Sequence, residues 1–345
     1  MIARTLRVRL QAVAVSALAL LPEGAAAQQQ QQQQQQQVVT VYSSRSHYGS
    51  ERVFEAFTRE TGIKVEFFQG NNNEVLERLR SEGRRSRADL LLTVDAGNLW
   101  FAAQQGLLQP VRSAILARSI PAHLRDPGNQ WFAIATRART IVYSTDRVDP
   151  SELSTYAALG DPKWRGRLCL RTSTAIYNQS LLASLIRVSG ERETERIVRG
   201  WVANEPIYIN GDTQILEAIA AGRCDVGIAN HYYLARMLAR SPDTPVAVYW
   251  ADQQGGGTHV NISGAGVTRH ARNRAGAIRL LEYLTTEAAQ SVLAAGSYEF
   301  PANPSVPANG VLKRFGPFKP QSVGVAAAGQ FQAAAVRLAD RAGYR

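Results

Sequence analysis

Segments with the periodicity of strands alternate with segments with the periodicity of helices along most of this 345-residue sequence. A first series predicts strands at 38–42, 63–68 and 88–94, separated by helices that begin at Ser50 and Asn73. A second series predicts strands at 167–170 and 225–229 and helices at 178–188 and 212–221. Strand-helix-strand repetition of this kind favours an α/β fold built on mostly parallel, doubly wound sheets.

Two apolar segments are extended enough to connect these two series. The segment 131–143 can cross from the first half of the chain to the second, and the segment 258–267 can carry the chain back. Two crossings between two α/β lobes make a hinged clamp, in which ligands bind beyond the carboxyl ends of the strands. We therefore expect a first lobe of residues 38–135 plus about 265–312, and a second lobe of residues 140–260 plus about 313–345.

The start of the sequence has the pattern of an export signal. Three arginines precede an apolar stretch from about Leu10 to Leu21, and a small-residue cleavage pattern follows at 25–27. Because the apolar stretch is too short to span a membrane, we expect a secretory signal peptide over residues 1–27. The ten glutamines at 28–37 have no apolar surface to bury and predict a disordered leader before the folded part.

The formal net charge of the chain is +11. A basic surface can steer an anionic ligand or a membrane partner toward a protein, although a generally basic exported protein needs no specific role for its charge. We expect no nucleic acid as a partner, because the chain is exported and its basic residues are dispersed without a recognisable binding motif.

The two cysteines of the sequence are Cys169 and Cys224. In an oxidising compartment an isolated pair is more often a disulfide than a metal site. Such a bond would join the segment that leads to Tyr177 to the strand that leads to Tyr232.

Two adjacent tyrosines, Tyr232 and Tyr233, follow the strand predicted at 225–229. Asn230 is a suitable N-cap residue, and the apolar residues after the pair have helical spacing. Both phenols would then lie in the first helical turn, about 100° apart around the axis, so that they lean into one cleft. The positive end of the helix dipole favours phenolate, which is a ligand for a hard cation such as ferric ion. Most adjacent tyrosines, however, only pack with their hydroxyls in water.

Other residues with suitable side chains also follow predicted strands. His47 and Tyr48 lie in the loop after the first strand, and Tyr177 lies at the start of the helix that follows the strand at 167–170. Each of them alone has a packing explanation. Their shared placement at strand ends favours the hypothesis that they face one cleft from the two lobes.

Six segments, in order along the chain, carry a resemblance to a known family: 42–45 with His47-Tyr48, 88–97, 161–167, 177–181, 225–230 with Tyr232-Tyr233, and 257–267. From about Val38 onward the sequence resembles periplasmic ferric-iron-binding proteins, the substrate-binding components of ABC-type iron transporters. The resemblance therefore covers nearly the whole chain after the predicted signal peptide and the glutamine run.

This resemblance implies a ligand set and a transport role. The implied iron ligands are Tyr48, Tyr177, Tyr232 and Tyr233, with His47 as a further ligand in some members. The implied fold is a transferrin-like, two-lobed clamp of the periplasmic-binding-protein type that closes on Fe³⁺, with or without a synergistic anion. A periplasmic location, a supply of ferric ion or ferric chelate, and an ABC-type iron permease in the inner membrane as partner are also implied. We expect the protein to act as a monomer.

Two positions depart from the family pattern. Ser46 is inserted between Arg45 and His47, so the loop of the first lobe can present His47 differently. His231 stands where a small hydroxyl residue is usual. We leave His231 out of the ligand set and expect it to support the site from behind or to bind water.

The chemistry of the tyrosines agrees with a hard cation. Hard cations prefer oxygen donors, and a phenol with an ordinary pKa near 10 loses its proton only when such an ion binds. Four phenolates on Fe³⁺ would leave a charge of about −1, which Arg45 or another nearby arginine can offset. Zinc and copper favour clusters of histidine and cysteine, which this sequence lacks.

Enzyme motifs in the sequence are incomplete. The run Ser263–Gly266 lacks the leading glycine of a nucleophile elbow, and the glycines at 255–257 are not followed by the lysine of a phosphate loop. We therefore expect a binding protein rather than an enzyme. The main alternative to iron is the same clamp holding an oxyanion or a small organic cation, on which the tyrosines stack or to which they donate hydrogen bonds.

Overall fold

The computed structural model describes residues 37–45, 51–308 and 310–345. The predicted signal peptide, the glutamines before Gln37, and the residues Ser50, His47 and Tyr48 lie outside this part of the chain. The predictions made for them stay predictions. In the described part of the chain, no helix is long and apolar enough to cross a membrane.

The first lobe contains three parallel strands and the helices between them. Its elements are β1 (Val38–Ser43), α2 (Glu51–Thr61), β2 (Lys64–Gln69), α3 (Asn72–Glu82), β3 (Leu90–Val94), α4 (Ala96–Gln104), α5 (Ala114–Ser119), α10 (Arg274–Tyr283), α11 (Glu287–Ser297) and β10 (Phe300–Pro301). Strand β1 pairs in parallel with β2 and with β3. The helix after β1 buries Val53, Phe54 and Phe57, as its apolar spacing predicted.

The second lobe repeats this arrangement. Its elements are β5 (Leu168–Leu170), α6 (Ile176–Ser189), α7 (Glu191–Ala203), β6 (Ile207–Tyr208), α8 (Asp212–Ala220), β7 (Val226–Asn230), α9 (His231–Arg240), β8 (Val246–Tyr249), α12 (Ala327–Gln330) and α13 (Gln332–Ala342). Strand β5 pairs in parallel with β6 and β7. Helix α12 also contacts α4 of the first lobe.

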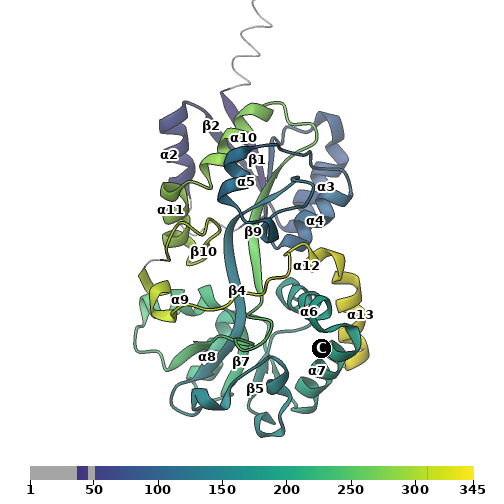
Figure 1. Cartoon of the computed structure of the whole chain (residues 1–345), viewed down its shortest axis with the longest axis vertical. Helices are drawn as coiled ribbons and strands as arrows, with labels where there is room; N and C mark the ends of the chain where they lie inside the picture. The colour runs from purple at the N-terminus through teal and green to yellow at the C-terminus, as the bar shows by residue number, and fades with distance from the viewer. Residues whose placement is uncertain (1–36, 46–50, 309) are drawn as a thin grey trace, which may run out of the picture.

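Two crossing strands, β4 (Phe132–Ser144) and β9 (Val260–Val267), join the lobes (Figure 1). Strand β4 pairs with β9 from Phe132 to Ala138 and then with β7 from Arg139 to Tyr143. The described strands form one sheet in the order β2-β1-β3-β9-β4-β7-β5-β6, with β8 and β10 also paired to β4. The predicted fold class of two α/β lobes joined by crossing strands is confirmed.

The sheet is mixed, whereas the sequence predicted mostly parallel pairing. Every pairing of β4 and the pairing of β3 with β9 are antiparallel. The reason is that strands which carry the chain out of a lobe and back again run against their neighbours. The parallel pairing that strand-helix-strand repetition predicts therefore holds only for the strands within each lobe.

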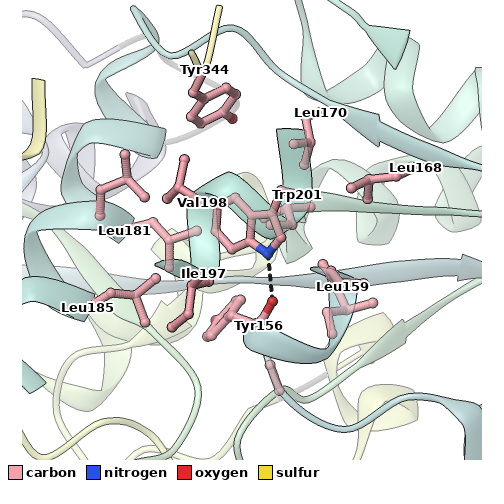
Figure 2. Close-up of a cluster of buried hydrophobic side chains, with 14 of the residues drawn as sticks. Tyr156, Leu159, Leu168, Leu170, Leu181, Leu185, Ile197, Val198, Trp201 and Tyr344 are labelled. Carbon is pink, nitrogen blue, oxygen red and sulfur yellow. Dashed lines mark hydrogen bonds between the residues drawn. The ribbon is translucent and has the colours of Figure 1, made fainter. Parts of the chain in front are cut away.

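The core of the second lobe is centred on Trp201 of α7, which is almost fully buried (Figure 2). Its indole nitrogen donates a hydrogen bond to the backbone oxygen of Tyr156, at 2.7 Å. Leu181 and Leu185 pack α6 into the same cluster. This packing holds the body of α6, whose first turn carries Tyr177.

Glycines on β9 allow it to lie unusually close to the backbone at the start of β4 and just before it. A Cβ atom at Gly266 would lie 2.4 Å from the backbone oxygen of Gln130, and one at Gly264 would lie 2.8 Å from that of Phe132. No side chain fits at these distances without moving the backbone. The glycines of the Ser263–Gly266 run therefore serve the close approach of the crossing strands.

Gly266→Ala is expected to destabilise the protein by roughly 1–3 kcal/mol, because the crossing strands would have to separate. Gly255→Ala is the matched control, since a Cβ there would meet only the backbone oxygen of Asp252, at 3.8 Å. Urea unfolding of both variants measures the difference. Equal stability of the two variants would contradict the close-approach explanation.

Candidate functional site

A cavity of about 50 Å³ lies where residues of both lobes and both crossing strands meet. Its lining residues are Arg45, Val94, Arg137, Tyr177, Tyr232, Tyr233, Arg236, Ser263, Ser297 and Glu299. Three of the five sequence-predicted site residues, Tyr177, Tyr232 and Tyr233, are among them. His47 and Tyr48 fall in the segment 46–50, outside the described residues, and Arg45 directly before that segment lines the cavity.

Tyr232 and Tyr233 lie in the first turn of α9, as predicted. Their ring centroids are 4.4 Å apart with an angle of 33° between the ring planes, so both rings lean the same way into the cavity. Tyr232 is buried and Tyr233 is half-buried. Every residue of the preceding strand β7 is buried. The packing of β7 therefore fixes where the chain leaves the sheet, and with it the position of the two tyrosines.

Asn230 occupies the N-cap position of α9, but its side chain does not cap the helix. Its amide oxygen accepts a hydrogen bond from Arg139, and its amide nitrogen donates one to the hydroxyl of Tyr232, each at 3.3 Å. The predicted start of the helix after Asn230 is confirmed. The prediction that the Asn230 side chain caps the helix is wrong, because its hydrogen bonds go to other residues. A buried guanidinium competes for the oxygen that an exposed N-cap residue would give to its own helix.

Helix α6 begins at Ile176, two residues before the start predicted from the sequence at Asn178, so Tyr177 lies inside its first turn rather than directly before it. Two guanidinium groups lie near the ring of Tyr177, with centroid distances of 5.3 Å to Arg137 and 5.5 Å to Arg171. Arg236 is similarly placed at 5.7 Å and 5.6 Å from the rings of Tyr232 and Tyr233. Guanidinium groups thus lie near all three phenol rings, and the charges of Arg137 and Arg171 favour the ionised forms of Tyr232 and Tyr233, respectively.

Tyr232 and Tyr233 are nevertheless neutral at physiological pH. Burial raises the pKa of Tyr232 well above its ordinary value, and the neighbouring Tyr177 and Tyr233 raise it further, while Arg137 acts in the opposite direction. Burial and Tyr177 also raise the pKa of Tyr233. Ionisation of these groups therefore needs a bound cation.

A buried carboxylate, Glu299, is held between two arginines at the wall of the cavity. Its oxygens lie 2.7 Å from Nη2 of Arg45 and 3.1 Å from Nη1 of Arg137, and one also accepts a hydrogen bond from the Ser263 hydroxyl at 2.9 Å. Burial alone would raise the pKa of Glu299, but Arg45 and Arg137 lower it to about 2. This carboxylate is therefore ionised at all physiological pH values.

Arg137 keeps part of its hydrogen-bonding capacity unused. Its side chain is 2% exposed, and among residues 37–45, 51–308 and 310–345 its Nε and Nη2 atoms have no hydrogen-bond partner. A buried guanidinium that lines a cavity and has unused N–H groups is suited to an anionic oxygen.

The comparisons with known proteins agree with this geometry. A sequence model of the bacterial extracellular solute-binding proteins matches residues 86–317. The chain belongs to this family. Iron uptake protein A1 of Synechocystis sp. is 42% identical over 314 residues, which cover 89% of this chain and 87% of that protein.

Solved structures of family members have the same fold. FutA of Trichodesmium, solved with iron and citrate ligands, is 43% identical with a TM-score of 0.86, over 89% of this chain and all of that one. The Bordetella ferric binding protein is 36% identical with a TM-score of 0.82, over 89% of this chain and 99% of that one. The two-lobed architecture of this chain is therefore the architecture of its family, the solute-binding proteins.

The predicted disulfide is confirmed. Cys169 of β5 is bonded to Cys224, directly before β7, and their Cα atoms are 5.9 Å apart. The bond joins the strand that leads to Tyr177 to the segment that leads to Tyr232. It therefore restrains the two elements from which the cavity receives its phenols.

His231 lies behind the tyrosines. It is fully buried, its Nδ1 accepts a hydrogen bond from the backbone N–H of Ala138 at 3.1 Å, and its ring stacks on Phe300. Burial lowers the pKa of His231 to about 4, so the ring is neutral. The residue does not line the cavity but packs α9 against the crossing strand.

Sequence reasoning missed most of the charged residues at the cavity, above all Arg137 and Glu299. One signal for Arg137 was present, because an arginine inside the otherwise apolar segment 131–143 needs a buried partner. No comparable signal marked Glu299. Within the described ranges, no group of three or more histidine, cysteine, aspartate or glutamate side chains is placed to hold a metal ion.

Glu299→Gln is expected to lower the free energy of unfolding by roughly 3–5 kcal/mol at pH 7, because it leaves two buried guanidinium groups without their carboxylate. In the wild type, the pKa of Glu299 in the folded protein is about 2, below its ordinary value of 4.5. The stabilisation by its charge is thus complete above about pH 4.5 and is lost as the pH falls toward 2.

Urea unfolding at a series of pH values tests this prediction. The difference in the free energy of unfolding between wild type and variant should become smaller below pH 4.5. Glu205→Gln is the control, because its ion pair with Arg165 is exposed and should change stability by less than about 1 kcal/mol. A gap that stays constant down to the lowest pH would contradict the assignment.

Proposed function

We propose that this protein is a periplasmic ferric-iron-binding protein that holds Fe³⁺ in the cavity between its lobes. In this proposal the phenolates of Tyr177, Tyr232 and Tyr233 are ligands, and Tyr48 and His47 complete the site from the segment after β1. The observation that carries the proposal is the convergence of three tyrosines, from the starts of two helices, on one cavity surrounded by arginines. The relatives named for iron uptake and ferric binding support the same cargo.

The chemistry of the cavity supports a trivalent cation in particular. Phenolate oxygens are hard, anionic donors, and ferric ion has enough charge to displace the protons of phenols whose pKa is raised by burial. The guanidinium groups of Arg137, Arg171 and Arg236 reduce the repulsion among several phenolates. A divalent ion has less charge with which to displace these protons.

We infer that an anion binds beside the iron and uses those N–H groups of Arg137 that have no partner in the described part of the chain. Trichodesmium FutA, which was solved with citrate as well as iron, supports this inference. An iron complex whose absorption band is unchanged when citrate is replaced by carbonate or phosphate would argue against it. The same N–H groups also favour the alternative function, a clamp for an oxyanion without iron, which would give no visible band.

The transport role follows from the proposed cargo. We propose that the protein is exported by the signal peptide at 1–27, acts as a monomeric binding protein rather than an enzyme, and delivers iron to an ABC-type permease in the inner membrane. We propose that the two lobes, over the ranges predicted from the sequence, close on the metal and open at the permease. Unchanged iron uptake by cells that lack this protein would contradict the delivery step.

Purified protein mixed with ferric citrate is expected to turn orange-red through tyrosinate-to-iron charge transfer. Tyr232→Phe or Tyr233→Phe should nearly abolish the colour, because both ligands lie on one rigid helix start in the second lobe. Tyr283→Phe is the control, since Tyr283 lies on α10, away from the cavity. Absorbance and bound iron are measured together, and full iron binding without a visible band would count against tyrosinate ligation.

His47→Ala should leave a coloured complex that loses iron faster to a competing chelator. His47 comes from the first lobe and can join the site only when the clamp closes, so it affects retention more than capture. If His47→Ala removes iron binding while Tyr233→Phe retains it, the proposal that the second lobe captures iron first is wrong.

The colour is expected to fade on acidification. Because burial raises the pKa of Tyr232 and Tyr233, protons compete more strongly for these oxygens than for exposed phenols, and iron binding weakens as the pH falls. A titration of absorbance from neutral to acidic pH, with bound iron measured in parallel, checks this. Affinity that does not change with pH would exclude ligands that lose protons on binding.

A further inference from the structure

The segment 343–345, at the end of the sequence, returns to the second lobe beside the start of α6. Gly343 has a φ of 74°, which turns the chain after α13, and Tyr344 then enters the hydrophobic core with only 4% of its surface exposed. Its ring packs edge-on against Trp201 at a centroid distance of 6.3 Å, and Figure 2 shows both rings in the same cluster. Tyr344 is therefore fixed by packing before its hydroxyl makes any contact.

The hydroxyl of Tyr344 binds the loop that leads to Tyr177. It donates a hydrogen bond to the backbone oxygen of Arg171 at 2.7 Å and accepts one from the side-chain amide of Asn178, also at 2.7 Å. The Asn178 amide nitrogen also lies 2.8 and 2.9 Å from the backbone oxygens of Arg171 and Thr172, so its two N–H groups are shared among three acceptors. The residue directly after Tyr177 is thus bound on one side to the loop and on another to Tyr344.

Helix α6 lacks the usual means of fixing its own first turn. Its N-cap residue is Ala175, which makes no side-chain hydrogen bond to the helix. The backbone N–H of Ser173 instead donates to the backbone oxygen of Arg345 at 2.7 Å. Contacts from a distant part of the chain therefore take the place of a local cap.

The same hydrogen bonds extend to the second helix that carries tyrosines. The side-chain oxygen of Asn178 accepts a hydrogen bond from Nε of Arg139 at 2.9 Å. Arg139 also donates to Asn230, whose amide donates to the hydroxyl of Tyr232. A continuous set of buried hydrogen bonds thus links Tyr344 through Asn178, Arg139 and Asn230 to Tyr232.

We propose that Tyr344 and Asn178 are positioning residues for the tyrosine cluster: they hold the start of α6 so that the phenol of Tyr177 lies at the correct distance from that of Tyr232. This role rests on the proposed iron site. A metal site requires its ligands within a fraction of an ångström, and groups that orient ligands from behind commonly change metal affinity 10- to 100-fold. Neither residue lines the cavity, so their effect on iron is indirect.

Tyr344→Phe is the variant that tests the proposal, because it keeps the ring in the core and removes only the hydroxyl. We expect iron to leave this variant about 10-fold faster in the presence of a competing chelator, with a shifted charge-transfer band. Tyr208→Phe is the matched control: its ring lies 5.9 Å from that of Tyr344, but its hydroxyl does not bond to Arg171 or Asn178. The control should keep the wild-type release rate and band.

Thermal unfolding separates positioning from a merely structural role, since both variants remove a hydroxyl from the same core. A Tyr344→Phe protein that is less stable but has the wild-type release rate and band would overturn the proposal. Hydrogen exchange of the metal-free protein provides a second measurement. Amides of residues 171–179 should exchange faster in Tyr344→Phe than in wild type, and unchanged exchange there would also overturn the proposal.

The failure of the iron site itself would look different. If the wild type binds no ferric ion, or binds it without colour, the proposed function fails and the ligand role of Tyr177 fails with it. Hydrogen exchange would still decide whether Tyr344 holds the start of α6, because that measurement needs no metal.

Discussion

The arrangement of the cavity depends on strand β4 changing partners between Ala138 and Arg139. Up to Ala138 it pairs with β9, and from Arg139 it pairs with β7. The buried arginines on either side of the change each bind a carboxylate, Arg137 with Glu299 at 3.1 Å and Arg139 with Asp212 at 2.8 Å. An unpaired buried charge is strongly destabilising. The pair with Glu299 therefore attaches β4 to the first lobe, and the pair with Asp212 attaches it to the second lobe. Together the two pairs orient the lobes around the cavity.

The two arginines of these pairs differ in how many of their N–H groups form hydrogen bonds. Every side-chain nitrogen of Arg139 donates a hydrogen bond, and the acceptors are Asp212, Asn178, Asn230 and the backbone oxygen of Ile228. Arg137, on the cavity side, has N–H groups that no described residue accepts from, and it lies over the ring of Tyr177. The same strand therefore supplies one arginine that stabilises the second lobe and one that remains available to a ligand. For the proposed ferric site, this available positive charge lowers the free energy of forming several phenolates close together.

Sequence reasoning succeeded where the relevant interactions are local or follow from the compartment. The buried residues of α2 and the helix start at Tyr232 follow from periodicities of a few residues, and the pairing of Cys169 with Cys224 follows from export and the lack of other cysteines. It failed where a distant partner decides the contact. Asn230 was expected to cap α9, but Arg139, which is 91 residues away, takes its oxygen. The prediction of mostly parallel pairing was wrong for a similar reason. The strand propensity of a segment carries no information on the direction of the neighbouring strand.

The sequence alone determined the succession of strands and helices, the adjacency of Tyr232 and Tyr233, and the resemblance that named Tyr177 with them. Only the tertiary structure decided how those residues are surrounded. Glu299 lies 162 residues from Arg137 and 254 from Arg45, and Tyr344 lies 166 from Asn178. Such contacts arise from packing of whole lobes rather than from local preference, because a buried polar group bonds to whichever partner the fold brings near it.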